Sequence, residues 1–191
     1  MNKAIFLDRD GTINIDTGYI GDVNLVSLFP GVAEGIKKLK DQLGFIIIVI
    51  SNQSGITRGL ITSEDVDKVN NRINELLELS KTNIDAFYYC PFHPDYDSQE
   101  KCKCRKPSPQ LVFESSKKFN VDLTKSYFAG DKVSDIESGK NAGIKTVLIR
   151  NSLNEAEIIQ LQNSQNSPNF VADDFLTFVD FIEKDSRGEI F

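Results

Sequence analysis

The sequence has no apolar run long enough to cross a membrane, no stripe of basic residues and only three cysteines. The densest apolar run covers residues 45–50, the length of a strand. A net charge of −6 argues against a nucleic-acid partner, and the start of the chain does not resemble a secretory leader. We therefore expect a cytoplasmic protein without membrane partners, whose cysteines are thiols or metal ligands rather than disulfides.

Internal repeats and interdomain linkers are also absent, and low-complexity sequence is confined to the Ser/Asn/Gln-rich residues 162–169. A chain of 191 residues, 40% of them hydrophobic, can bury one substantial core. We expect a single domain, residues 1–191, that acts as a monomer.

Segments of strand and helix character alternate along the chain. Short apolar or β-branched runs predict strands at residues 4–7, 45–50, 85–89, 126–129, 145–149 and 170–172. Helical spacing and capping residues predict helices at residues 30–43, 62–77, 110–118, 134–142, within 151–169, and from 173 onward. This alternation predicts a doubly wound α/β domain with a mostly parallel sheet.

Two carboxylates follow the first predicted strand. Asp8 should lie at the edge of the sheet and Asp10 just beyond it, where the backbone turns at Gly11. Because two acids this close repel each other, a folded protein keeps them only with a cation or a proton between them. The alternative interpretation is a strand end followed by an ordinary Asp-Gly turn.

Other polar groups should converge on the same edge, because they follow parallel strands or lie in the irregular segment before residue 110. They are Ser51, Asn52, Gln53, Arg105, Lys106, Asp131, Lys132 and Asp135. Carboxylates combined with hydroxyl, amide and ammonium donors suit a hard divalent cation such as Mg²⁺ together with a phosphate. Taken singly, each position could equally be a turn or capping residue.

The order and spacing of these motifs over about residues 3–150 resemble the haloacid-dehalogenase (HAD) superfamily of phosphatases. The motifs are Asp8-Arg9-Asp10-Gly11-Thr12, Ser51-Asn52-Gln53, a loop lysine and Gly130-Asp131-Lys132-x-x-Asp135. Three further features resemble the D,D-heptose 1,7-bisphosphate phosphatase and histidinol-phosphatase group. They are Gly18-Tyr19-Ile20, Ser51 to Ile56 with Arg58-Gly59, and Cys102-x-Cys104-Arg105-Lys106-Pro107.

The resemblance implies a Rossmann-like core without a large cap domain and a mechanism with an aspartyl-phosphate intermediate. Asp8 would be the nucleophile and Asp10 the general acid and base. Mg²⁺ would be held by Asp8, the Asp10 backbone carbonyl and Asp131. Ser51 and Lys106 would stabilise the phosphoryl oxygens.

The substrate would be bound by residues from four loops, and Asp135 would brace the site rather than bind the metal. The expected binding residues are Tyr19, Asn52, Gln53, Arg58, Arg105 and Lys132. Arg58 and Arg105 are candidates for a second anionic group, since arginine grips phosphate bidentately. The alternative for Arg58 is a solvated surface charge.

All three cysteines and the only histidine lie within residues 90–104. Cys90, His93, Cys102 and Cys104 suit a structural Zn²⁺ site in a loop at about residues 90–107. The resemblance leads us to expect the imidazole two residues after Cys90, where this chain has Phe92. Either His93 shifts into the site, or three thiolates bind zinc weakly, or the cysteines are free thiols.

The resemblance implies a Mg²⁺-dependent phosphatase of small sugar phosphates. We expect removal of the C1 phosphate of D-glycero-D-manno-heptose 1,7-bisphosphate, in heptose precursor synthesis for lipopolysaccharide or S-layers. Histidinol phosphate is the alternative substrate, for which Asp16 and Asp22 could bind the cation. Two other classes remain: a non-catalytic metal-binding scaffold on this fold, and a phosphomutase or phosphotransferase, which the lack of a water-excluding cap disfavours.

Overall fold

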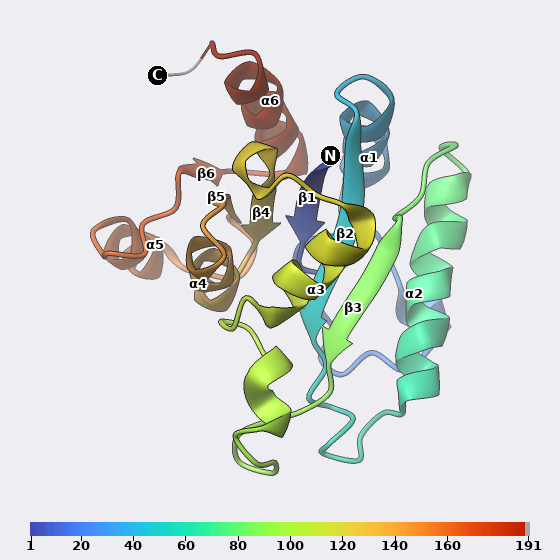
Figure 1. Ribbon diagram of the computed structural model, residues 1–191. Helices are drawn as coiled ribbons and strands as arrows, with labels where there is room; N and C mark the ends of the chain where they lie inside the picture. The colour runs from blue at the N-terminus through green and yellow to red at the C-terminus, as the bar shows by residue number, and fades with distance from the viewer. Residues whose placement is uncertain (190–191) are drawn as a thin grey trace.

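The computed structural model describes residues 1–189 and places six parallel strands in one sheet (Figure 1). The strands are β1 (Lys3–Leu7), β2 (Phe45–Asn52), β3 (Ala86–Cys90), β4 (Tyr127–Gly130), β5 (Lys145–Ile149) and β6 (Phe170–Ala172). Their order across the sheet is β3-β2-β1-β4-β5-β6, and every neighbouring pair is parallel. The chain grows outward from β1 and then outward from β4, so the winding reverses between these two strands. The predicted doubly wound α/β fold is confirmed.

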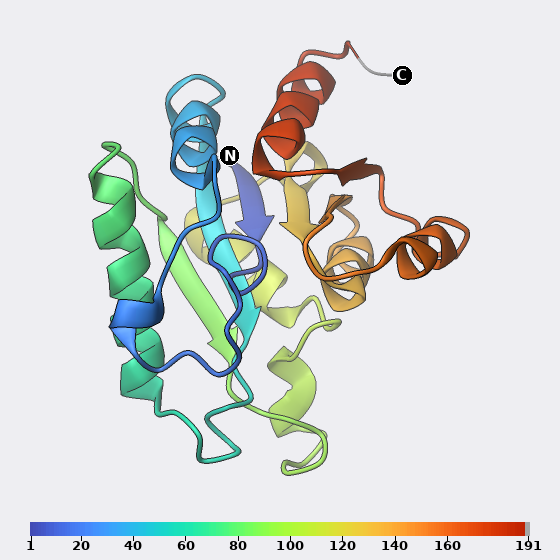
Figure 2. The same ribbon diagram turned by 180° about the vertical axis from the view of Figure 1, so that it is seen from behind.

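Helices cover both faces of the sheet because the strand side chains alternate. Ile5 and Leu7 of β1 join a core with α1 (Val32–Asp41), α2 (Ser63–Glu78) and α6 (Phe175–Ser186), which cover the face seen in Figure 2. Ala4 and Phe6 belong to the core on the other face, which α3 (Gln110–Phe119) and α4 (Val133–Asn141) cover. A smaller core joins α4 to α5 (Glu155–Gln162).

Most element boundaries differ from the sequence-based prediction by one or two residues, and two of these differences concern residues of the site. β2 continues through Ser51 and Asn52, since both pair with β3. α4 begins at Val133, one residue before the predicted start of this helix, with Lys132 as its N-cap. The reason is that the Asp135 carboxylate accepts a hydrogen bond from the Lys132 backbone N–H at 3.0 Å.

Three connecting segments extend beyond the carboxyl edge of the sheet, toward which the strand arrows point in Figure 1. They are residues 8–31, which contain η1 (Val23–Leu25), residues 53–62, and residues 91–109, which contain η2 (Lys101–Cys104). Ligands of doubly wound sheets bind at this edge, near the point where the winding reverses.

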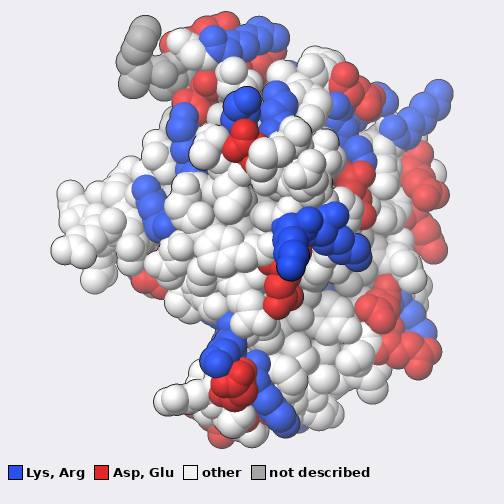
Figure 3. All heavy atoms as spheres, viewed as in Figure 1, with Lys and Arg blue, Asp and Glu red and all other residues white. Residues whose placement is uncertain are grey.

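The surface seen in Figure 3 carries Lys and Arg side chains interspersed with Asp and Glu side chains. This face therefore shows no basic stripe of the kind that nucleic-acid binding requires. Within residues 1–189, no helix combines the length and the apolar character needed to cross a membrane.

Candidate active site

Asp8 lies at the carboxyl end of β1, between the two strands where the winding reverses. Its backbone N–H donates to the Ala129 carbonyl of β4 at 3.1 Å, and only 4% of the residue is exposed. The ammonium of Lys106 lies 2.7 Å from Asp8 Oδ1 and 2.6 Å from Asp135 Oδ1. Lys106 also donates to the Ile50 carbonyl at 2.8 Å. The lysine is therefore fixed against the nucleophile candidate.

Asp8, Asp131 and Asp135 form a buried carboxylate cluster, in which one ligand oxygen from each lies within 4.8 Å of the others. Burial, and then the negative charge of Asp8, raise the pKa of Asp131. The same two causes raise the pKa of Asp135 to about 7. Lys106 pairs with Asp8 and Asp135 but not with Asp131, so the cluster of three acids favours a further cation. An all-oxygen donor set is the kind that Mg²⁺ prefers, so the residues present fit this metal.

Two hydroxyl groups orient the Asp131 carboxylate. Thr12 Oγ1 donates to Oδ1 at 2.8 Å, and the Ser152 hydroxyl donates to Oδ2. Gly11 lies beside them with φ +90°, and a Cβ at this position would collide with the Asp131 carboxylate. The predicted turn at Gly11 is thus required both by its backbone angle and by this close approach.

The Asp10 side chain accepts four hydrogen bonds. The donors are Arg9 Nε at 3.0 Å, Arg9 Nη2 at 2.8 Å, Asn14 Nδ2 at 2.9 Å and Gln53 Nε2 at 2.7 Å. Burial alone would raise the pKa of Asp10, but the Arg9 charge and these donors lower it below its usual value. Asp10 is therefore held as an ionised carboxylate with a defined direction.

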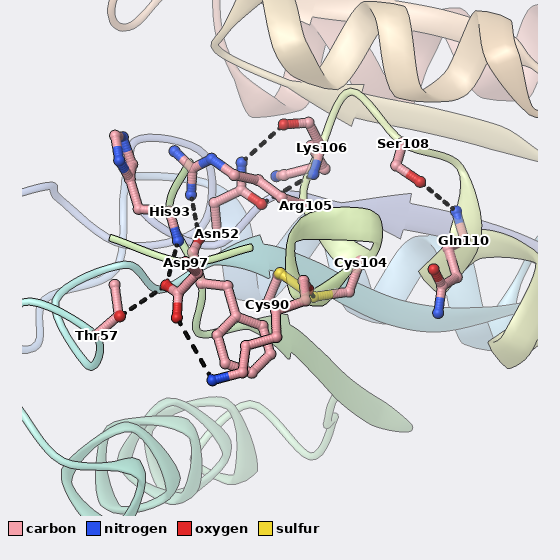
Figure 4. The surroundings of a disulfide bond; sticks show 12 residues. Asn52, Thr57, Cys90, His93, Asp97, Cys104, Arg105, Lys106, Ser108 and Gln110 are labelled. Atoms are coloured by element: carbon pink, nitrogen blue, oxygen red, sulfur yellow. Dashed lines mark hydrogen bonds and ion pairs between the residues drawn. A yellow bond between two sulfur atoms is a disulfide. The ribbon is translucent and has the colours of Figure 1, made fainter. Parts of the chain in front are cut away.

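The polar residues at the end of β2 support the catalytic groups. Asn52 Nδ2 donates to the Lys106 carbonyl at 3.2 Å, and Asn52 Oδ1 accepts from the Lys106 N–H at 3.0 Å, as Figure 4 shows. Gln53 Nε2 also donates to Ser51 Oγ at 3.2 Å. The Asn52 amide thus anchors the segment that carries Lys106, and Asn52 also lines a cavity beside Asp10, so its role as a substrate ligand stays a prediction.

A cavity of about 430 Å³ opens beside Asp10. It is lined by Asp10, Asp16, Gly18, Tyr19, Asn52, Gln53, Ser54, Arg105, Lys132 and Ser134. Lys132 Nζ donates to the Asp10 carbonyl at 3.3 Å and lies 3.4 Å from Asp16 Oδ2. Burial lowers the pKa of Lys132, but the charges of Asp8 and Asp131 outweigh it and raise the value. Most of the predicted binding residues therefore share one cavity with Asp10.

Two guanidinium groups lie at this end of the molecule without an acidic partner. The Arg58 guanidinium carbon lies 5.9 Å from the Tyr19 ring centroid and 5.1 Å from that of Tyr96. Arg105 Nη1 donates to the Phe92 carbonyl at 3.2 Å. Burial chiefly, and also the Arg58 charge, lower the pKa of Arg105. Neither arginine forms an ion pair with any carboxylate of residues 1–189.

The cysteine loop differs from the prediction. Cys90, at the end of β3, forms a disulfide with Cys104, and Cys102 is a free thiol (Figure 4). The prediction of thiols rather than disulfides is therefore wrong for this pair in this structure. The disulfide joins Cys90 at the end of β3 to Cys104, which lies two residues before Lys106. It therefore closes the base of the loop formed by residues 91–103.

His93 does not meet the cysteines either. Its ring points away from the two bonded sulfur atoms in Figure 4, and its Nδ1 accepts from the Asp95 N–H at 3.2 Å. Phe92 packs against the hydrophobic core that α3 covers. This contact fixes the backbone next to His93. Among residues 1–189, the three acids are the only cluster with metal-ligand geometry. The arrangement seen here is thus not a zinc site, and zinc binding is not confirmed.

Sequence reasoning missed four residues that orient the predicted acids. Arg9 and Thr12 lie in the first motif but were given no role, although Arg9 is only 1% exposed, and Asn14 lies two residues beyond that motif. Ser152 follows the fifth strand, so it had the same signal of position as the other strand-end residues. Each of these side chains holds a carboxylate of the site.

A model of the HAD-hydrolase-like family matches residues 103–178. The D-glycero-D-manno-heptose-1,7-bisphosphate 7-phosphatase of Chlorobaculum tepidum is 42% identical over 181 residues, which cover 90% of this chain and 89% of that protein. The D-glycero-beta-D-manno-heptose-1,7-bisphosphate 7-phosphatase of Escherichia coli K12 is 37% identical over 77% of this chain and 78% of its own length.

A crystal structure of D,D-heptose 1,7-bisphosphate phosphatase from B. bronchiseptica, complexed with magnesium and phosphate, matches with a TM-score of 0.83. The match covers 96% of this chain and 99% of that one at 24% identity, which shows the fold. With the carboxylate cluster, the fold and the near full-length relatives in agreement, the chain is a HAD-type phosphoric monoester hydrolase and belongs to the family of heptose 1,7-bisphosphate phosphatases.

Proposed function

We propose that this protein hydrolyses the C7 phosphate of D-glycero-D-manno-heptose 1,7-bisphosphate. The observation that carries the proposal is the buried cluster of Asp8, Asp131, Asp135 and Lys106 beside the 430 Å³ cavity. Our sequence-based choice of the C1 phosphate is corrected to C7, because both curated relatives are named 7-phosphatases.

Magnesium is supported by the fit of Asp8 and Asp131 and by the solved relative that contains this ion. The Asp10 backbone carbonyl lies within reach of the Lys132 ammonium, at the same edge of the sheet. We propose that the Asp8 carboxylate, the Asp131 carboxylate and the Asp10 backbone carbonyl would be the ligands of Mg²⁺. When bound, Mg²⁺ neutralises negative charge on the phosphoryl oxygens.

The chain's own residues then divide the reaction between them. Asp8 attacks phosphorus in line, so that a carboxylate oxygen–phosphorus bond forms while the bond to the sugar oxygen breaks. Asp10 is ionised in the substrate-free protein, so it must take up a proton as the negatively charged phosphate binds beside it. It then gives that proton to the departing oxygen and later takes one from the water that hydrolyses the aspartyl phosphate. Lys106 keeps Asp8 in place, and we assign the Ser51 hydroxyl, which accepts a hydrogen bond from Gln53, as a donor to the phosphoryl group.

Arg58 and Arg105 support a substrate with two phosphates. Within residues 1–189 neither has an acidic partner. Arg105 lines the cavity and Arg58 lies against Tyr19 of its wall, and guanidinium groups placed in this way suit an anion. Histidinol phosphate would instead need an acid for its ammonium group. Asp16 faces Lys132, and Asp22 caps η1 by accepting from the Asn24 N–H at 2.9 Å. Both acids that we considered for that cation are therefore engaged.

Zinc binding stays a prediction and concerns a different state of the loop, in which Cys90, Cys102 and Cys104 are all reduced. Metal analysis together with a count of reactive thiols in the denatured protein separates the two states. One zinc with three thiols would establish the zinc loop, whereas one thiol and no zinc would establish the disulfide. Cytoplasmic location and a monomeric state likewise remain predictions.

The test of the proposed function is phosphate release from heptose 1,7-bisphosphate with added Mg²⁺, followed by ³¹P NMR. We expect loss of the C7 phosphate signal while the C1 signal remains. Folded protein that releases no phosphate from any sugar phosphate would instead favour the scaffold alternative.

A further inference from the structure

Asn70 is a buried polar residue on the face of α2 that packs against the sheet. It is 7% exposed, and its helix neighbours Val66, Val69 and Ile73 are fully buried. A buried side-chain amide needs hydrogen-bond partners. Asn70 Oδ1 accepts from Arg9 Nη1 at 3.1 Å, a contact between residues 61 positions apart.

Arg9 connects Asn70 to Asp10. Its Nε and Nη2 donate to the two carboxylate oxygens of Asp10 at 3.0 and 2.8 Å, while Nη1 donates to Asn70. Asp10 is its only ion-pair partner among residues 1–189. A guanidinium is a rigid planar fork, so a partner on Nη1 helps to set the plane in which the other two nitrogens meet the carboxylate.

We propose that Asn70 and Arg9 are positioning residues for Asp10, with Asn70 acting through Arg9. The inference rests on the proposed role of Asp10 as proton donor to the departing oxygen. That role needs the carboxyl group to face the leaving oxygen, and a displacement of about 1 Å at a reacting group can cost ~10²-fold in rate. Without Asn70, the Arg9 fork can rotate and disturb its two hydrogen bonds to the Asp10 carboxyl, which Asn14 and Gln53 alone would then orient.

A purely structural role for Asn70 would slow all substrates equally, whereas a positioning role depends on the leaving group. Benzyl phosphate and 4-nitrophenyl phosphate are similar in size. The benzyl alkoxide needs a proton from Asp10 as the phosphorus–oxygen bond breaks, but 4-nitrophenolate leaves without one. Their kcat/KM values report the steps up to the aspartyl phosphate, which isolates the proton donation.

The experiment compares both substrates in four proteins with Mg²⁺: wild type, Asn70→Leu, Asn70→Asp and Asn74→Leu. Asn74 is the matched control, because it lies one turn further along α2 and contacts the Ile84 backbone instead of Arg9. We expect Asn70→Leu to lower kcat/KM for benzyl phosphate by about tenfold or more relative to 4-nitrophenyl phosphate. Asn70→Asp keeps an acceptor for Arg9 and should restore the wild-type ratio, and Asn74→Leu should leave the ratio unchanged.

An equal loss for both substrates in folded Asn70→Leu would overturn the proposal. If that variant does not fold, Asn70→Ala carries the same comparison. Asp10→Asn distinguishes the two levels of inference. If Asp10→Asn changes the ratio and the Asn70 variants do not, the positioning role is wrong while the proposed function stands. If Asp10→Asn leaves the ratio unchanged, the role of Asp10 is wrong and the positioning proposal falls with it.

Discussion

The Lys106 ammonium lies 2.7 Å from Asp8 Oδ1, which joins the segment before α3 to the end of β1. The two residues are 98 positions apart in the printed sequence, and both are buried. Because Lys106 also contacts Asp135, a single ammonium holds two carboxylates in place.

Replacing Lys106 by methionine should impair both stability and turnover. Two buried carboxylates would lose their counter-charge, which typically costs about 3–5 kcal/mol. Urea unfolding measures the stability, and phosphate release measures the rate. Lys125→Met is the control, since the Lys125 ammonium is exposed and lies as far as 3.8 Å from the Asp122 carboxylate. Wild-type stability in the Lys106 variant would contradict this reading of the contact.

Asp8→Asn should abolish turnover and preserve the fold. An amide cannot form the acyl phosphate, but it has almost the shape of the carboxylate and can still accept a hydrogen bond from Lys106. Activity assays with circular dichroism check both halves of the prediction. Asp173→Asn, which changes an exposed acid, should behave as wild type. Appreciable turnover by Asp8→Asn would exclude Asp8 as the nucleophile.

The metal-free protein should lose stability as the pH rises toward neutrality. Asp135 has a folded-state pKa raised from 3.8 to about 7, so its protonated form is favoured by folding. This contribution is complete below pH 3.8 and disappears as the pH rises through about 7. Urea unfolding in a chelator, compared with Asp135→Asn, isolates it. Parallel stability curves for the two proteins across this interval would refute the raised pKa.

Arg58→Met should weaken binding of a bisphosphate substrate more than binding of a monophosphate. Loss of a charged hydrogen-bonding group from an anion site typically costs about 1.5–3 kcal/mol, which corresponds to about tenfold or more in KM. Steady-state kinetics on heptose 1,7-bisphosphate and heptose 7-phosphate measure the difference. Arg72→Met on α2, which removes an exposed charge paired with Glu75, is the control. An equal effect on both substrates would place Arg58 outside the anion site.

The strand ends and the acids at them were predictable, because apolar runs mark buried strands and parallel strands place their ends at one edge. Asp8, Asp131 and Asp135 therefore meet as their positions indicate. The partner of a buried arginine is not predictable in this way. Asn70 lies at a core position of α2, but only the packing of α2 against the first loop shows that it contacts Arg9.

The arrangement of the cysteine and histidine side chains in residues 90–104 was also not predictable from the sequence. Four potential ligands within residues 90–104 suggested a metal, but sequence spacing does not say which way a side chain points. The Asp95 backbone N–H occupies His93 Nδ1, and Cys90 lies close enough to Cys104 for a covalent bond. The sequence also could not decide between heptose bisphosphate and histidinol phosphate. That choice depends on whether Asp16, Asp22 and the two arginines are already paired with other charges, which only the structure shows.

The most direct test of the proposed function is the ratio of kcat/KM for D-glycero-D-manno-heptose 1,7-bisphosphate to that for histidinol phosphate, measured with Mg²⁺ on the same protein. We expect a strong preference for the bisphosphate, because Arg58 and Arg105 attract its second phosphate, whereas Asp16 and Asp22, the acids considered for a substrate ammonium, are already engaged. A preference for histidinol phosphate would contradict the account.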